Sequence, residues 1–250
     1  SGQRLSDSEL LVKGTLSVLG TADAPVVLSS SNAVAAAGDW GGIYLDQNAS
    51  LALSYAHLSY TGYGIKSASG IGSVEITHSR LEFSGGGIDL RQSYNSTSKR
   101  VITDNVISVG SSEWALNIGL CCYNQALLPN LSRNVITNPQ GSGLYVSDAR
   151  QGVTIESNTI TVRSGALQLG YGAGAIAITS NVLDSTYPAS ECCGAGSGIA
   201  IYGVEETGGP DNAITSITVH DNEIRQFRTG LYLDTYGRTV LSSVTGNRIE

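Results

Sequence analysis

Along most of the chain, aliphatic residues recur in short groups of period two, separated by a polar corner at a fixed offset. The recurring unit reads aliphatic, two residues, Asn, one residue, aliphatic, and occurs six times. Its asparagines are Asn105, Asn134, Asn158, Asn181, Asn222 and Asn247. Two earlier copies, at Leu53/Ala56/Leu58 and Ile76/Ser79/Leu81, keep the aliphatic pair without the asparagine.

A second group precedes each copy: a small residue, an aliphatic residue, any residue and another aliphatic residue, as in Gly42-Ile43-Tyr44-Leu45. Repeats with a period in the twenties, built from short period-two strands, indicate a β-solenoid. Equivalent strands are then parallel and about 4.8 Å apart, and their connections are almost always right-handed. We therefore predict an all-β fold, a single-stranded right-handed parallel β-helix of about eight to nine coils with three short strands each.

The asparagines are expected at the tight corner between the second and third strands of each coil. Asn tolerates the left-handed backbone conformation, and its amide can hydrogen-bond to the Asn of the next coil. The six residues are therefore predicted to form a structural ladder.

The whole chain, 1–250, is expected to form one elongated domain, because a solenoid grows by adding coils. Residues 1–30 form a less regular first coil, and 31–250 form regular coils. The surplus residues are predicted to lie in inserted loops at 92–99, 119–129, 185–196 and 204–213. Insertions on a solenoid often border a binding face, although neutral surface loops are the alternative because long loops cost little stability.

Charge and composition limit the classes of binding partner and the cellular location that can be expected for the protein. The net charge is -7, and the 14 Lys and Arg residues are scattered, which argues against nucleic-acid binding. There is no run of about 18 apolar residues, so no membrane insertion is expected. Three lysines, no methionine and many Ser, Thr, Gly and Asn residues resemble secreted proteins. An extracellular or cell-surface location is therefore predicted.

The four cysteines occur as two adjacent pairs, Cys121-Cys122 and Cys192-Cys193, both in predicted insertions. An even number in such loops favours disulfides in an extracellular setting. Metal binding is the rival, but adjacent cysteines lack the C-x-x-C spacing of zinc sites, and no metal site is predicted. The connectivity stays open: a bond between neighbours is strained, a bond between the pairs spans three coils, and a bond to another subunit is the third option.

The first strand of each coil offers the candidate ligand face. Strand alternation predicts that the small residue and the residue between the two aliphatic positions point to solvent, which gives a flat track beside a row of larger side chains. Such a track suits an extended sugar chain, with tyrosines for stacking and amides for hydrogen bonds. The alternative is that small residues only permit a tight turn and that exposed Tyr suits any sheet. The candidate face comprises Tyr44, Lys66, Asp89, Arg91, Asn117, Tyr145, Gln168, Tyr202, Tyr232 and Asp234.

No catalytic residue is assigned. Lys66, Asp89 and Arg91 are the first residues to test for catalysis, with a surface salt-bridge ladder as the alternative. Glycoside hydrolysis uses two carboxylates about 5 to 9 Å apart, and Asp89 has no carboxylate at the matching position of either adjacent coil. The histidines at positions 57, 78 and 220 are expected to be solvent-facing corner residues.

The pattern from about Leu11 to Glu250 resembles the right-handed parallel β-helix proteins related to pectate lyases. It is carried by Gly-Ile-Tyr-Leu at 42–45, Val-Thr-Ile-Glu-Ser-Asn-Thr-Ile at 153–160 and Thr-Val-His-Asp-Asn-Glu-Ile at 218–224. That superfamily includes polysaccharide lyases, polygalacturonases, alginate epimerases, phage tailspikes and non-enzymatic adhesins. The resemblance therefore implies saccharide contact more readily than a reaction. The polygalacturonase signatures Asn-Thr-Asp, Asp-Asp and Gly-His-Gly and the epimerase segment Asp-Pro-His-Asp are missing.

Two functions are predicted from these patterns. The first is a secreted or cell-surface structural or adhesive module that binds carbohydrate and assembles head to tail with copies of itself, because terminal coils expose strand edges. The alternative is a polysaccharide-active enzyme, a lyase, glycoside hydrolase or epimerase, acting along the first-strand face. No cofactor is expected for the first function. Calcium is expected only if the protein is a polysaccharide lyase.

Overall fold

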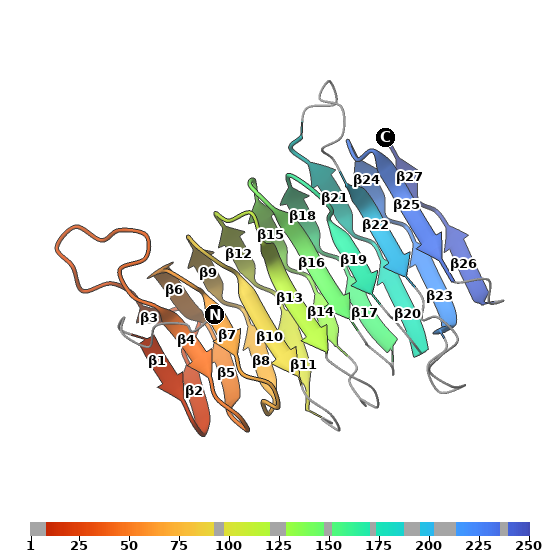
Figure 1. Ribbon diagram of the computed structural model, residues 1–250. Coiled ribbons are helices and arrows are strands. Elements are labelled where there is room, and N and C mark those ends of the chain that lie inside the picture. The colour runs from red at the N-terminus through yellow and green to blue at the C-terminus, as the bar shows by residue number, and fades with distance from the viewer. Residues whose placement is uncertain are drawn as a thin grey trace.

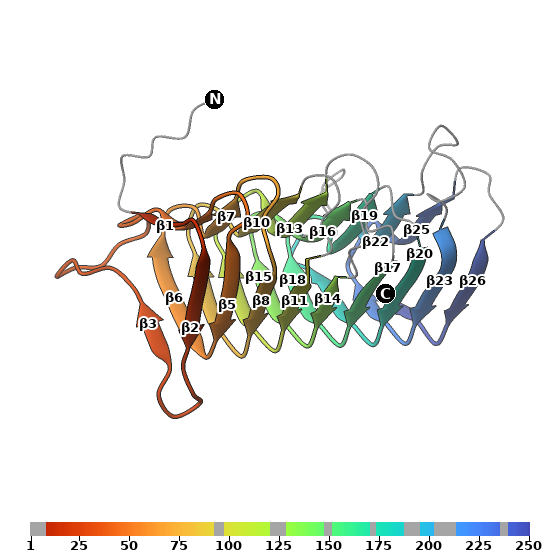
Figure 2. The ribbon, with the colours of Figure 1, turned by 90° about the horizontal axis from the view of Figure 1, so that it is seen from below.

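The computed structural model describes residues 9–92, 98–120, 129–147, 152–170, 174–187, 196–202, 214–235 and 240–250. The strands in these ranges form three sheets of nine strands, and the ranges contain no helix. The chain winds through the three sheets in turn and advances along one axis (Figures 1 and 2). Each coil contributes one strand to each sheet, which confirms the predicted all-β solenoid with parallel strands.

The strands follow one another in the same cyclic order throughout. The first sheet contains β1 (Glu9–Val12), β4 (Gly42–Leu45), β7 (Ile65–Ser67), β10 (Ile88–Gln92), β13 (Trp114–Leu120), β16 (Ser142–Ser147), β19 (Leu167–Gly170), β22 (Ser197–Tyr202) and β25 (Thr229–Asp234). The second sheet contains β2 (Thr15–Leu19), β5 (Ser50–Ser54), β8 (Val74–Thr77), β11 (Arg100–Thr103), β14 (Asn130–Ser132), β17 (Gly152–Glu156), β20 (Gly174–Thr179), β23 (Ile214–His220) and β26 (Leu241–Thr245). The third sheet contains β3 (Val26–Leu28), β6 (Ala56–Thr61), β9 (Arg80–Phe83), β12 (Val106–Val109), β15 (Val135–Asn138), β18 (Thr159–Val162), β21 (Val182–Ser185), β24 (Glu223–Arg225) and β27 (Arg248–Ile249).

Stacks of aliphatic side chains fill the interior. In the second sheet, one stack pairs residues of successive coils in register: Ile76, Ile102, Leu131, Ile155 and Ile178. All five are fully buried. Burying each such side chain contributes about 1.5–3 kcal/mol, and a slip of one residue would turn the whole stack outward. The aliphatic repeat therefore fixes the register of the coils.

The asparagine corner runs beside this stack, between the second and third sheets. Asn105, Asn134, Asn158, Asn181 and Asn222 are each at most 1% exposed. Their side-chain amides donate to the amide oxygen of the next asparagine and to a backbone carbonyl of the preceding coil. Each buried amide therefore bonds in both directions along the axis.

The left-handed residue of the corner is not the asparagine, so that part of the prediction is wrong. Positive φ angles fall on the preceding residue, for example 62° at Asp104, 55° at Arg133 and 57° at Ser157. The residue before each asparagine reverses the direction of the backbone, and the asparagine side chain occupies the inside of the corner. The division is physical, because the asparagine amide must point inward to reach the neighbouring coils.

Seven of the eight small residues that precede the aliphatic pair of the first-sheet strands are buried, and Gly230 is intermediate, so the predicted flat surface track is wrong. Gly42 and Gly64 are buried, and Ala115 and Ala166 are 0% exposed. A Cβ at Gly42 would meet the carbonyl oxygen of Gly64 at 2.1 Å. These positions are small because the backbone of the next coil occupies the space.

The inserted loops are largely outside the described residues. Cys121, Cys122, Cys192 and Cys193 all lie there, as do most of 92–99, 119–129 and 185–196 and all of 204–213. Nowhere in the described ranges does the fold contain a helix that could cross a membrane.

Candidate functional site

The outward side chains of the first sheet form one row across successive coils. Strand pairing places six of the predicted face residues opposite one another in turn: Tyr44, Lys66, Asp89, Asn117, Tyr145 and Gln168. All six are intermediate in exposure. Paired positions in a sheet repeat about every 4.8 Å, so the row presents one functional group per coil.

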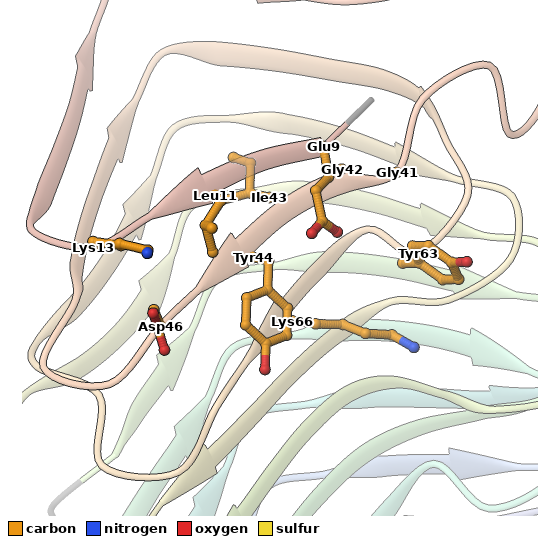
Figure 3. A pocket seen from close by; sticks show the side chains of 10 residues that line it. All are labelled: Glu9, Leu11, Lys13, Gly41, Gly42, Ile43, Tyr44, Asp46, Tyr63 and Lys66. Carbon is orange, nitrogen blue, oxygen red and sulfur yellow. The ribbon is translucent and has the colours of Figure 1, made fainter. Parts of the chain in front are cut away.

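A cavity of about 410 Å³ opens at the β1 and β4 end of this row. Figure 3 shows the residues that line it: Glu9, Leu11, Lys13, Gly41, Gly42, Ile43, Tyr44, Asp46, Tyr63 and Lys66. The Lys66 Nζ lies 4.9 Å from the centre of the Tyr63 ring, a cation–π contact that helps to hold the amine in place. The cavity thus combines two tyrosines with two carboxylates and two amines.

The candidate face did not include Glu9, Lys13, Asp46 and Tyr63. Glu9 and Lys13 belong to the first coil, which lacks the asparagine corner, and Tyr63 lies in the turn before Gly64. The available signal was the run Leu10-Leu11-Val12, which forms β1 and pairs in register with β4. That pairing brings Glu9 beside Gly42 and extends the face by one coil.

The centre of the row contains a polar contact and an unsatisfied acceptor. The Asn117 Nδ2 donates to the Asp89 Oδ1 at 3.2 Å. The Asn117 Oδ1 is buried and has no hydrogen-bond partner among the described residues. An unpaired buried acceptor costs free energy.

Two aromatic pairs lie along the same sheet. The rings of Trp114 and Tyr145 are 5.4 Å apart between centroids, and those of Tyr202 and Tyr232 are 5.3 Å apart. Both distances are in the range of favourable aromatic pairing. Trp114 was not predicted, because it lies before the small residue Ala115 and outside the repeated group, although a Trp at the start of the group was a visible signal.

The row is interrupted towards the C-terminus. The buried residue Ala200 stands between Gln168 and Tyr232 in the pairing order. Tyr202 pairs with Asp234 two positions further along their strands. The tyrosines at this end therefore form a second group, apart from the six-residue row.

The candidate catalytic trio is only partly placed. Lys66 and Asp89 pair directly across β7 and β10. Arg91 lies in β10 opposite Gly119, and its side chain is outside the described part of the structure. The pairing of an amine and a carboxylate is equally consistent with a surface ladder.

The histidines differ from one another: the prediction of a corner position holds for His78 but is wrong for His57 and for His220, the last residue of β23. His57 is a strand residue of β6, not a corner residue, and its Nε2 lies 3.2 Å from the Glu82 Oε2. His78 is at the corner with a φ of 50°, stacked on Tyr55. The His220 Nδ1 lies 2.6 Å from the Asp221 Oδ2. Within the described ranges, no group of three His, Cys, Asp or Glu side chains is placed to hold a metal ion.

Comparison with known families agrees with this geometry. A family model described as right handed beta helix region matches residues 41–212. The chain belongs to the right-handed β-helix family. No curated protein and no solved structure shows significant similarity to it. Membership confirms the fold and handedness expected for this β-helix, and its activity must be argued from its own side chains.

Proposed function

We propose that this β-helix is a secreted or cell-surface module, structural or adhesive, that binds an extended carbohydrate along the outward row of its first sheet. The observation that supports the proposal is the register of Tyr44, Lys66, Asp89, Asn117, Tyr145 and Gln168 over successive coils. A polymer lying along the solenoid axis meets a new aromatic or hydrogen-bonding group about every 4.8 Å.

The chemistry of the row suits sugar rings. Different pyranose rings of the polymer pack their apolar faces against Tyr44 and Tyr145, while hydroxyls of the intervening and following sugars pair with Lys66, Asp89 and Gln168. The backbone beneath these side chains is held by the sheet ladder, so little conformational freedom is lost on binding. The cavity of about 410 Å³ at Tyr44 is within the size range of small-ligand sites and provides an end point for the chain.

Binding without turnover is favoured by the distribution of acids. From Tyr44 to Gln168, Asp89 is the single carboxylate among the described row residues, and its paired neighbours are Lys66 and Asn117. Two facing carboxylates are what most glycoside hydrolases require.

The alternative, a polysaccharide-active enzyme, is supported by the cavity at the end of the row. Glu9 and Asp46 line it together with Lys13 and Lys66. Incubation with acidic and neutral polysaccharides, with and without calcium, tests this reading through shortened or unsaturated products. Product formation that Lys66→Ala abolishes would replace the binding proposal.

The binding proposal is tested on a glycan array, followed by calorimetry with the oligosaccharides that bind. Tyr145→Ala should weaken binding about tenfold, since it removes stacking worth about 1.4 kcal/mol. Thr154→Ala is the matched control, because Thr154 lies in β17 of the same coil on the second sheet. Binding that is unchanged in Tyr145→Ala and Tyr44→Ala would reject the face.

End-to-end assembly is the second part of the proposal. Val244 and Ile249 in the last coil pair with the buried residues Val219 and Ile224, and they are 44% and 55% exposed. A further coil, from the same chain or from another copy, would cover them. Electron microscopy at rising protein concentration tests the assembly: filaments support it, and single particles at every concentration reject it.

A further inference from the structure

A second groove lies away from the first-sheet row, at the edge of the third sheet. Its volume is about 480 Å³, and it crosses four successive coils at β6, β9, β12 and β15, which lie side by side in Figure 1. Tyr60, Glu82, Ser108 and Thr137 line it, together with Val109 and Pro139. The groove therefore runs along the solenoid axis and has polar as well as apolar walls.

Tyr60 reaches this groove because of a break in the strand pairing. The register of β6 against β9 shifts between Leu58 and Thr61, and Tyr60 has a φ of 59°. The Trp40 Nε1 donates to the Ser59 carbonyl at 2.8 Å, and Trp40 forms an isolated bridge with Thr61. A left-handed non-glycine residue costs roughly 1 kcal/mol or more and persists where its neighbours impose it.

The consequence of the bulge is an aromatic ring on the surface. Tyr60 is 40% exposed, whereas its neighbours Ser59 and Thr61 are buried. Bulges frequently re-aim a side chain at a functional position. Trp40 thus contacts the backbone of the residues on both sides of Tyr60, Ser59 and Thr61.

Glu82 supplies a fixed acceptor beside this ring. Its Oε1 accepts from the Arg80 Nε at 2.7 Å, and its Oε2 lies 3.2 Å from the His57 Nε2. Burial raises the pKa of Glu82, but the hydrogen bonds from Arg80 and His57 outweigh this and hold the pKa below its usual value. The carboxylate is therefore ionised at neutral pH, and Arg80 already balances its charge.

Hydroxyl groups continue the line from Glu82. Strand pairing places Glu82 opposite Ser108 and Ser108 opposite Thr137, so acceptor and hydroxyl groups follow one another about every 4.8 Å. Arg80 occupies the Glu82 Oε1, but the Oε2 beside His57 retains a lone pair, and hydroxyls both donate and accept. None of the described residues that line the groove is cationic, and the neighbouring Arg80 is already paired with Glu82, so an acidic ligand would find no free counter-charge there.

We propose that this groove binds a neutral oligosaccharide lying along the solenoid axis, with one sugar ring stacked on Tyr60 and its hydroxyls donating to Glu82 and pairing with Ser108 and Thr137. Pro139, which is exposed, provides an apolar wall for the C–H faces of the sugar. The site is independent of the first-sheet row, because it lies on another sheet and shares no residue with it.

The test uses the full chain and calorimetry with cellohexaose, xylohexaose and maltohexaose, and hexagalacturonate as the acidic comparator. At least one neutral hexasaccharide should bind, and Tyr60→Ala should weaken its binding about tenfold through the loss of stacking. Tyr60→Phe keeps the ring and should bind within about twofold of the unsubstituted protein. Glu82→Gln, which removes the anionic acceptor, should weaken binding by about tenfold.

Controls separate this groove from the first-sheet row. Tyr145→Ala should leave binding at the groove unchanged, whereas a loss of all binding in that variant would overturn the inference and leave the first-sheet proposal standing. Absence of neutral hexasaccharide binding, or equal binding in Tyr60→Ala, would also overturn it, as would a preference for hexagalacturonate that depends on Tyr60. If Tyr60→Ala fails to fold by circular dichroism, Ser108→Trp, which fills the groove, takes its place and must abolish binding.

Discussion

Asn134 and Asn158 are joined by two hydrogen bonds to one atom. The Asn158 Oδ1 accepts from the Asn134 Nδ2 at 3.0 Å and from the Asn134 backbone N–H at 2.9 Å. Asn158 in turn donates to the Asn181 Oδ1 at 2.9 Å and to the Leu131 carbonyl at 2.8 Å. One buried side chain therefore couples its own coil to the coil before it and the coil after it.

Asn158→Ala should destabilise the protein by about 3 kcal/mol, because several buried polar groups lose their partners at once. Chemical denaturation followed by circular dichroism measures the change. Thr154→Ala, on the outer side of the neighbouring strand, should change stability by less than about 0.5 kcal/mol. Equal effects of the two substitutions would show that the ladder adds little to stability.

Substitution of Gly87 tests the buried small positions, and substitution of the exposed Gly14 is the control. A Cβ at Gly87 would lie 2.1 Å from the Ala115 carbonyl oxygen, whereas no described atom lies within 4 Å of a Cβ at Gly14. Gly87→Ala should therefore cost at least about 2 kcal/mol, and Gly14→Ala should stay within about 0.5 kcal/mol of the unsubstituted protein. Thermal unfolding of the two variants checks the difference. A tolerated Gly87→Ala would contradict the close approach of the coils.

The ion pair between Asp104 and Arg133 should make the stability of the protein depend on pH. The Arg133 Nε and Nη2 donate to the two Asp104 carboxylate oxygens at 2.7 and 2.8 Å. The hydrogen bond from Arg133 lowers the pKa of Asp104 below its ordinary value of 3.8, against the opposing effect of burial. Because the folded-state pKa is depressed, the stabilisation is present above pH 3.8 and is lost as the pH falls through the folded-state value.

Asp104→Asn isolates that charge, since Asn tolerates the left-handed conformation that Asp104 adopts with a φ of 62°. The variant should be less stable than the unsubstituted protein at neutral pH, and the two should converge well below pH 3.8. Denaturation midpoints across the acid range measure the convergence. A stability difference that is independent of pH would contradict the ion pair.

The aliphatic repeat was sufficient to predict the three-stranded coils, because inward positions such as Ile102 and Leu131 must be apolar and evenly spaced. It did not predict Arg100, which is fully buried in register with Val74. The Arg100 Nη1 donates to the carbonyls of Gly72 and Lys99 at 2.6 and 2.7 Å, and burial lowers its pKa to about 10. Such partners are set by loop geometry, which periodicity does not encode.

In the candidate sites, too, some contacts follow from the sequence repeat and others are visible only in the folded structure. Tyr44 and Lys66 occupy equivalent places in the repeat, so their pairing followed from the sequence. Strand alternation failed at Gly42, the first residue of β4, because its φ of 111° departs from strand geometry and the Gly64 carbonyl of the next coil lies against it. The exposure of Tyr60 depends on Trp40, 20 residues earlier, through a bond from a side chain to the backbone. Contacts of this kind require the folded chain.

The most direct test of the central proposal is a titration of the isotopically labelled β-helix with an oligosaccharide identified on the array, followed by backbone amide chemical shifts. If the first-sheet row binds the ligand, the perturbed amides lie in β4, β7, β10, β13, β16 and β19, and affinity rises with oligosaccharide length as successive coils are engaged. Perturbations confined to the second or third sheet, or an affinity that is independent of length, would contradict the proposal.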